Sequence, residues 1–128
     1  MAFEKVSPHL VELVRSWSER LGGELRTMFG CPVVFVNGHM CLGAHEDRLF
    51  LRVGQEERAA LEGRFDEVEP FDPKGGRPMR EYVSLPEPLY GDEDLLAGWA
   101  TRAGERLRAM PPKRPRPRRT GARARRGG

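Results

Sequence analysis

The fold is decided by residues 32–43, which read PVVFVNGHMCLG. Apolar residues stand on both sides of Asn37 and Gly38, and Asn followed by Gly is typical of a two-residue type I′ turn, because both central positions need a positive φ. The stretch therefore predicts a β-hairpin. Its expected cross-strand pairs are Val36 with His39, Phe35 with Met40, Val34 with Cys41, and Val33 with Leu42.

Side chains alternate between the two faces of such a hairpin. One face would carry Val33, Phe35, Met40 and Leu42, and we expect this strongly apolar face to lie against the core; the other would carry Val34, Val36, His39 and Cys41. In the same register Cys31 points away from Cys41. We therefore predict two reduced thiols rather than a disulfide, as is usual in a cytosolic protein.

Working outward from the hairpin, capping and periodicity signals predict the remaining elements. Ser7 and Pro8 are typical of a helix start, and so is Asp92 at the front of the last helix; Gly22 and Gly23 are typical of a helix end. Residues 48–53 alternate like a strand, with Leu49, Leu51 and Val53 inward, and Pro86 and Pro88 are expected to end the last strand. The expected elements are a first helix from residue 8 to about 21, strands at 24–28, 48–53, 67–69 and 79–85, and helices at 55–63 and about 92–110.

These elements predict an α+β fold in two layers. The expected order is a helix, three or four short strands, a helix, one or two strands and a helix, in short α-β-β-β-α-β-β-α. We expect an antiparallel sheet with helices packed on one face, because short hairpin connections rather than crossover helices separate the early strands. A chain of 128 residues accommodates one such domain. We assign it to residues 1–112.

The charge is divided unevenly along the chain. Of 22 basic residues, eight lie at positions 113–128, which leaves 14 against 19 acidic residues, a formal charge of −5, in residues 1–112. We predict that residues 113–128 form a disordered Arg-, Pro- and Gly-rich basic tail. Its cations are Lys113, Arg114, Arg116, Arg118, Arg119, Arg123, Arg125 and Arg126.

Two interpretations of this tail stay open. Eight cations would neutralise several phosphates and give salt-dependent, sequence-independent nucleic-acid binding, or the tail could be a solvated segment without a specific partner. The tail contains no aromatic residue, so stacking on single-stranded bases is not expected.

Signals for a reaction are weak. Lys74, Gly75, Gly76 and Arg77 could form an anion-binding loop, since glycines let backbone N–H groups approach a phosphate, but they match no phosphate-binding fingerprint. We do not expect a metal or thiol site, because the spacing of the candidate ligands differs from that of zinc sites and the two cysteines point apart. The candidate ligands are Cys31, His39, Cys41, His45 and Asp47. We predict no cofactor and no enzymatic activity.

Nowhere do about 18 apolar residues follow one another, and the N-terminus has no signal-peptide pattern. We therefore expect a cytoplasmic protein without membrane contact.

The turn and glycine residues of this chain resemble a known family. The sequence at residues 28–30, 37–43, 51–54 and 76–79, followed by Leu95 and Trp99, is similar to the N-terminal domain of the TfoX/Sxy competence regulators over about residues 5–112. Members usually have a second glycine where Cys31 stands here, and Lys74 with Gly75 lengthens the loop before Gly76.

The resemblance implies a two-layer fold and a bacterial regulatory role. Full-length members regulate DNA-uptake genes together with the cyclic-AMP receptor protein and carry a second, helical domain, in whose place this sequence has its Arg-rich tail. We expect a stand-alone, non-enzymatic regulatory domain with a protein partner, as a monomer or homodimer, and with nonspecific nucleic-acid affinity in the tail. The alternative is a small-molecule or anion-binding domain that uses Lys74 to Arg77.

Overall fold

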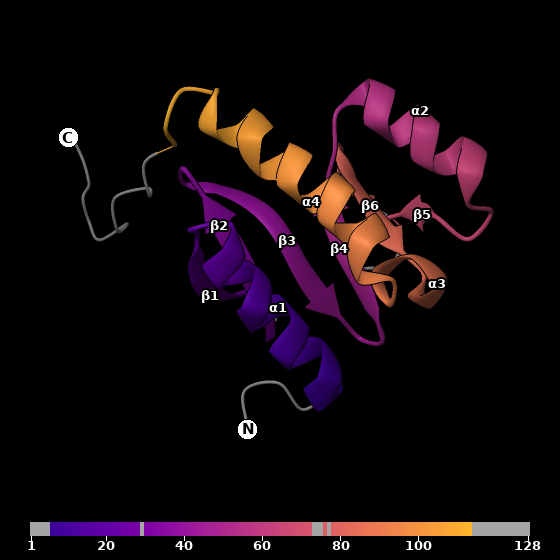
Figure 1. Cartoon of the computed structure of the whole chain (residues 1–128), viewed down its shortest axis with the longest axis horizontal. Coiled ribbons are helices and arrows are strands. Elements are labelled where there is room, and N and C mark those ends of the chain that lie inside the picture. The colour runs from indigo at the N-terminus through magenta and orange to yellow at the C-terminus, as the bar shows by residue number, and fades with distance from the viewer. Residues whose placement is uncertain (1–5, 29, 73–75, 77, 114–128) are drawn as a thin grey trace.

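A computed structural model of the chain describes residues 6–28, 30–72, 76 and 78–113. Within these residues, helices and an antiparallel six-stranded sheet form an α+β fold (Figure 1), with the strand order β1-β2-β3-β4-β6-β5. The elements are α1 (Pro8–Arg20), β1 (Glu24–Met28), β2 (Cys31–Val36), β3 (His39–His45), β4 (Arg48–Arg52), α2 (Gln55–Arg64), β5 (Glu69–Pro70), β6 (Tyr82–Leu85), α3 (Glu87–Tyr90) and α4 (Glu93–Arg108).

The predicted fold class is confirmed, and the predicted order of elements needs one correction. Four strands precede α2, the larger of the two numbers expected, and the short helix α3, which was not predicted, stands between β6 and α4. Pro86 and Pro88 end β6 as expected, but they also start α3, since a proline fits the first turn of a helix. The strand predicted at 79–85 is shorter because Glu81, at φ 68°, interrupts the extended backbone before Tyr82.

Helix caps form where the sequence predicts them. The Ser7 hydroxyl accepts a hydrogen bond from the Leu10 amide at 3.2 Å, and the Asp92 carboxylate accepts one from the Leu95 amide at 3.2 Å. Each satisfies an amide that the first turn of a helix leaves without a partner. The caps set the first residues of α1 and α4.

The central hairpin has the predicted turn but not the whole predicted register. Asn37 (φ 56°) and Gly38 (φ 82°) have the left-handed conformation of a type I′ turn. The pairs Val36 with His39 and Phe35 with Met40 also agree with the prediction. Beyond them a bulge inserts one extra residue in β3, so that Val34 pairs with Leu42 instead of Cys41.

The helices cover the hairpin face opposite to the predicted one, and the bulge adds Leu42 to that face. Val34, Val36, Cys41 and Leu42 belong to the large cluster that the helices cover, whereas Val33, Phe35 and Met40 belong to a second cluster. The predicted core face is therefore wrong except for Leu42. Both hairpin faces are apolar, so alternation alone did not reveal which one the helices cover.

The cysteine prediction is also partly wrong. Cys31 and Cys41 both lie in the helix-covered cluster instead of on opposite faces. They do not form a disulfide with each other.

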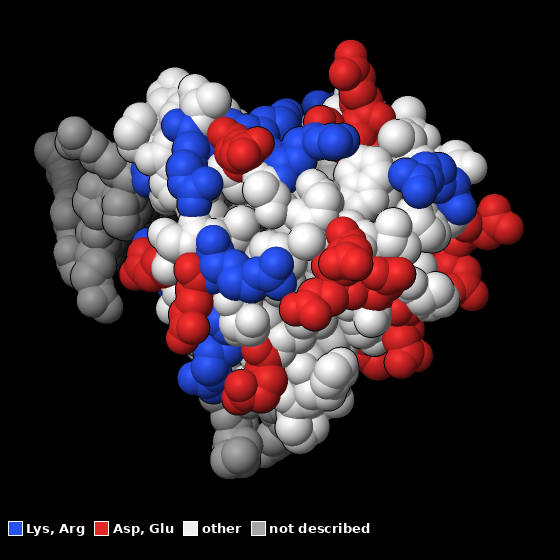
Figure 2. All heavy atoms as spheres, viewed as in Figure 1, with Lys and Arg blue, Asp and Glu red and all other residues white. Residues whose placement is uncertain are grey.

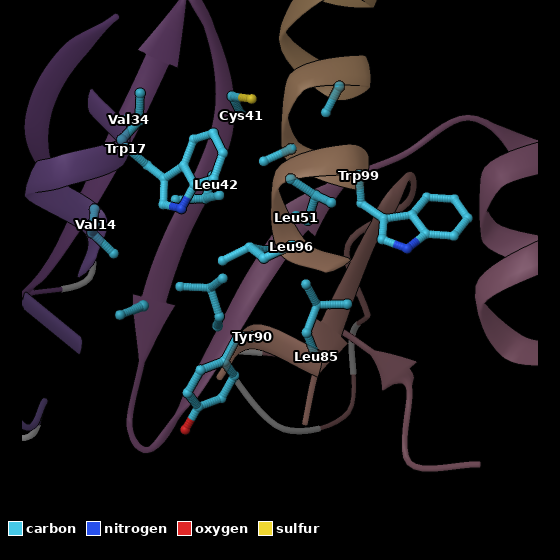
Figure 3. Packing of buried hydrophobic residues seen from close by; sticks show 14 of the residues in the cluster. Val14, Trp17, Val34, Cys41, Leu42, Leu51, Leu85, Tyr90, Leu96 and Trp99 are labelled. Carbon is cyan, nitrogen blue, oxygen red and sulfur yellow. The ribbon is translucent and has the colours of Figure 1, made fainter. Parts of the chain in front are cut away.

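The main core lies between the sheet and the helices (Figure 3). Trp17 of α1, Leu96 of α4 and Leu51 of β4 meet there, and Trp99 extends toward α2. All four helices contribute buried residues to this cluster, which confirms that they pack on one face of the sheet. Among the helices of the described chain, none has the length and apolar character needed to cross a bilayer.

The opposite face of the sheet has a smaller core that is closed without a helix. Phe71 stacks on Phe50 with ring centroids 4.1 Å apart, and the Tyr82 hydroxyl donates to the Met40 carbonyl at 2.8 Å. Phe71 and Met79, which flank the segment before β6, cover these strand residues. Together they shield the second apolar face from water.

Gly43 provides a test of this packing. A Cβ on Gly43 would lie 2.5 Å from Phe50 Cζ and 2.6 Å from Val33 Cγ1, both buried. We predict that Gly43→Ala lowers the free energy of unfolding by about 1–3 kcal/mol. Gly98→Ala is the matched control, because nothing lies within 4 Å of its Cβ position and an alanine inside a helix should stabilise α4 by about 1 kcal/mol. Urea denaturation of both variants measures the difference, and equal stability would contradict the packing described.

Candidate functional site

The side chain of Asn37 connects the central hairpin to the end of α4. Its Nδ2 donates to the carbonyls of Leu107 at 3.0 Å and Met110 at 2.9 Å. The Leu107 carbonyl also accepts from the Met110 amide at 3.2 Å, so the Asn37 amide adds a second donor to Leu107 and gives the Met110 carbonyl, just beyond the helix, a partner. The same residue that makes the hairpin turn therefore fixes the C-terminal end of α4.

Residues 111–113 are held by the same turn. The Lys113 amide donates to the Asn37 carbonyl at 3.1 Å. Since a carbonyl can only accept, His39 donates through Nε2 to Pro111 at 2.9 Å. A Cβ on Gly38 would overlap the Lys113 carbonyl, so glycine is required for this close approach as well as for the turn. The described chain ends at Lys113, beside the β2–β3 turn (Figure 1).

The predicted tail begins at this anchor. Lys113 is exposed. The other seven predicted cations, Arg114, Arg116, Arg118, Arg119, Arg123, Arg125 and Arg126, lie outside the described residues. The structure therefore describes only the first residue of the predicted tail, Lys113.

Only Gly76 of the predicted anion-binding loop is described; Lys74, Gly75 and Arg77 lie outside the described residues. Gly76 has a φ of 113°, and its amide donates to the Asp72 carboxylate at 2.6 Å. The one backbone amide of this loop that is described therefore already donates a hydrogen bond to a carboxylate. That contact disfavours an incoming phosphate at Gly76.

One histidine of the central hairpin, His45, lies on the side of the sheet opposite to the Cys41 thiol. Cys41 faces the helices, whereas the His45 ring packs against Phe71 with centroids 5.6 Å apart. In the part of the chain that the structure describes, no three His, Cys, Asp or Glu residues are arranged to hold a metal ion. Burial raises the pKa of the Cys41 thiol to about 12, although Arg108 and Arg52 oppose the shift.

A cleft of about 650 Å³ lies near the β3–β4 turn, and its wall is mainly acidic. Four carboxylates line it, those of Asp47, Glu67, Glu69 and Glu87. Arg48 also lines it, but its guanidinium is already bound to the Ser84 hydroxyl at 2.6 Å and the Glu67 carbonyl at 2.6 Å. The sequence did not predict this cleft, because its residues come from segments far apart in the chain.

A second cleft gathers basic side chains. Arg58, Arg80 and Arg106 line it together with Glu81. These arginines come from α2, the segment before β6, and α4, so no local sequence pattern joins them. The only local signal is Gly54, which ends the predicted strand at 48–53.

Comparison with known proteins gives one match. The family model described as the TfoX N-terminal domain matches residues 22–107, which run from just before β1 almost to the end of α4. A search of curated proteins found no match.

Replacing Asn37 tests the anchor. Asn37→Gly keeps a residue that adopts a positive φ but removes both hydrogen bonds to α4, so we expect a loss of about 1–2 kcal/mol in stability and faster amide exchange at residues 107–113. Glu46→Gly is the matched control, because Glu46 has the same backbone conformation (φ 58°) and an exposed side chain. Equal effects of the two substitutions would show that the anchor contributes nothing.

The Cys41 thiol should be unreactive while the chain is folded. A rise of its pKa from 9.0 to about 12 reduces the thiolate fraction near pH 8 about a thousandfold relative to the unfolded chain. The folded chain holds the thiol proton up to a higher pH than the unfolded chain does. The part of the free energy of unfolding that is linked to this proton is therefore fully present below pH 9 and is lost as the pH rises toward 12. Peptide-level mass spectrometry after iodoacetamide treatment, with and without urea, measures this. Rapid native alkylation of Cys41 would contradict the burial.

Proposed function

The chain belongs to the TfoX N-terminal domain family, and on this basis we propose that it is a non-enzymatic bacterial regulatory domain of the cytoplasm, related to the Sxy competence regulators. It acts through a protein partner and through nonspecific nucleic-acid binding by its basic tail. Family membership supports a regulatory, competence-related domain. The more specific parts of the proposal rest on the charge distribution and on the edges of the sheet.

The observation that carries the proposal is the separation of charge at the Lys113 anchor. Residues 1–112 have a formal charge of −5, whereas residues 113–128 contain eight basic residues and no acidic one. An acidic domain repels phosphates, so nucleic acid would meet the tail rather than the folded surface. Because Asn37 and His39 hold residues 111–113, the cations start from a fixed point.

The open edge of the sheet supports the part of the proposal that concerns a protein partner. β1 (Glu24–Met28) is an edge strand, and its Leu25 and Met28 are exposed by 37% and 38%. The opposite edge, β5, has two residues and includes Pro70, which has no amide to donate. A partner protein that adds a strand would therefore bind at β1.

Salt dependence tests the nucleic-acid part. We predict that the affinity for a short DNA duplex of random sequence falls steeply with salt, with a slope of log K against log salt of up to about −7 for eight cations. Replacing Arg116, Arg118 and Arg125 with Gln should make that slope shallower by about 2–3, because each phosphate contact contributes about 0.9. Fluorescence anisotropy at several salt concentrations measures the slope.

The matched control removes the same charge from the folded surface. Arg15, Arg64 and Arg102 are exposed and lie on three different helices. Their replacement with Gln should leave the slope unchanged. If both triple variants change the slope equally, net charge rather than the tail determines binding, and the proposal for the tail fails.

A further inference from the structure

The basic cleft has a definite place in the fold. Its volume is about 630 Å³, and it lies where the end of β4, the start of α2, the residues before β6 and the C-terminal half of α4 meet. Arg58, Arg80 and Arg106 line it, against a single lining carboxylate, that of Glu81. Figure 2 shows basic side chains gathered between α4 and the start of α2, with acidic ones beside them.

Arg106 has an unsatisfied donor in this cleft. Its Nη1 is buried and has no hydrogen-bond partner among the described residues. A buried guanidinium N–H without an acceptor is costly, and native structures seldom leave one unpaired. Because Arg106 lines the cleft, an anion there would supply the missing acceptor once the guanidinium turned Nη1 toward it.

Gly54 creates the room for Arg106. A Cβ at this position would lie 3.1 Å from Arg106 Nε and 2.6 Å from Glu57 Oε1. Gly54 is also the N-cap of the ten-residue helix α2 and offers no side-chain cap to its first turn. The partial positive charge of that helix end therefore adds to the guanidinium groups.

Glu81 is turned toward another partner. Its carboxylate binds Arg52, with Arg52 Nη2 2.9 Å and Nε 3.0 Å from Glu81 Oε1. Its left-handed backbone (φ 68°) is stabilised by the hydrogen bond from the Val53 amide to the Glu81 carbonyl at 2.7 Å. Such strained residues often occur at binding sites. Arg52 already neutralises Glu81, and Arg58 is paired with Glu62 at 3.1 Å. Arg80 and Arg106 are therefore the arginines that keep the cleft positive.

We propose that this cleft binds a small phosphorylated ligand whose phosphate contacts Arg106 and Arg80. Planar guanidinium groups match phosphate oxygens through paired N–H donors. The volume falls in the range of small-molecule sites, so the cleft has room for more than a bare phosphate group. The proposal is independent of the tail.

Pyrophosphate is the probe for the test. In isothermal titration calorimetry on the full chain, at fixed ionic strength in chloride, the wild type should bind pyrophosphate, and Arg80→Gln and Arg106→Gln should each weaken binding about tenfold or more. Arg80 is exposed, so its replacement stays informative even if Arg106→Gln fails to fold. Arg102→Gln is the matched control, because Arg102 is exposed on α4, outside the cleft, and should leave the affinity unchanged.

A third variant tests the geometry without removing a charge. Gly54→Ala places a methyl group against the Arg106 guanidinium and the Glu57 carboxylate, both flexible side-chain ends. We expect this variant to fold and to bind pyrophosphate more weakly than the wild type. Wild-type affinity in Gly54→Ala would contradict the position of Arg106 in the site.

Further outcomes distinguish a failure of the cleft proposal from a failure of the prediction for the tail. Absence of pyrophosphate binding by the wild type, or unchanged binding in both Arg80→Gln and Arg106→Gln, overturns it. Loss of pyrophosphate binding only in the variant lacking Arg116, Arg118 and Arg125 would assign the anion to the tail instead. If Arg80→Gln and Arg106→Gln weaken duplex DNA as much as pyrophosphate, the cleft contacts a nucleic-acid backbone and the small-ligand proposal fails.

Discussion

The Asn37–Gly38 turn is the constraint on which the rest of the structure depends. It reverses the chain between the two central strands and caps the end of α4 through the Asn37 amide. Its backbone also accepts the Lys113 amide and so determines where the tail begins. Arg108 adds a second link by donating to the Leu21 carbonyl at the end of α1. Local hairpin geometry and the positions of both long helices are thus coupled through a few hydrogen bonds.

Interactions within a few residues could be predicted from the sequence. The Ser7 and Asp92 caps, the type I′ turn and the inward positions of Leu49 and Leu51 all depend on residues close together in the chain. The bulge at Cys41 could not be predicted from nearby residues. It lets both Cys41 and Leu42 pack against the helices, and those helices come from segments far away in the chain.

For the candidate sites too, features formed by neighbouring residues could be seen in the sequence, whereas those formed by distant segments could not. The two cations and two glycines of residues 74–77 are typical of an anion-binding loop, yet the one amide of this loop that is described, that of Gly76, donates to the Asp72 carboxylate. The cleft that does gather guanidinium groups draws Arg58, Arg80 and Arg106 from three segments, so only the tertiary fold joins them. Gly54 belongs to the family pattern, but only the tertiary fold places the Arg106 guanidinium against it.

The cleft and the tail attract anions for different physical reasons, and this separates the two proposals. In the proposal for the tail, cations act through counterion release, so the proposed affinity is spread over many phosphates and falls steeply with salt. Arg106 acts through a buried donor that already lacks a partner, so its gain comes from one well-placed acceptor and is screened much less. Within a domain of formal charge −5, a positive cleft is retained because Arg52 neutralises the Glu81 carboxylate. The ion pair between Arg52 and Glu81 is therefore part of the site, although Arg52 does not line the cleft.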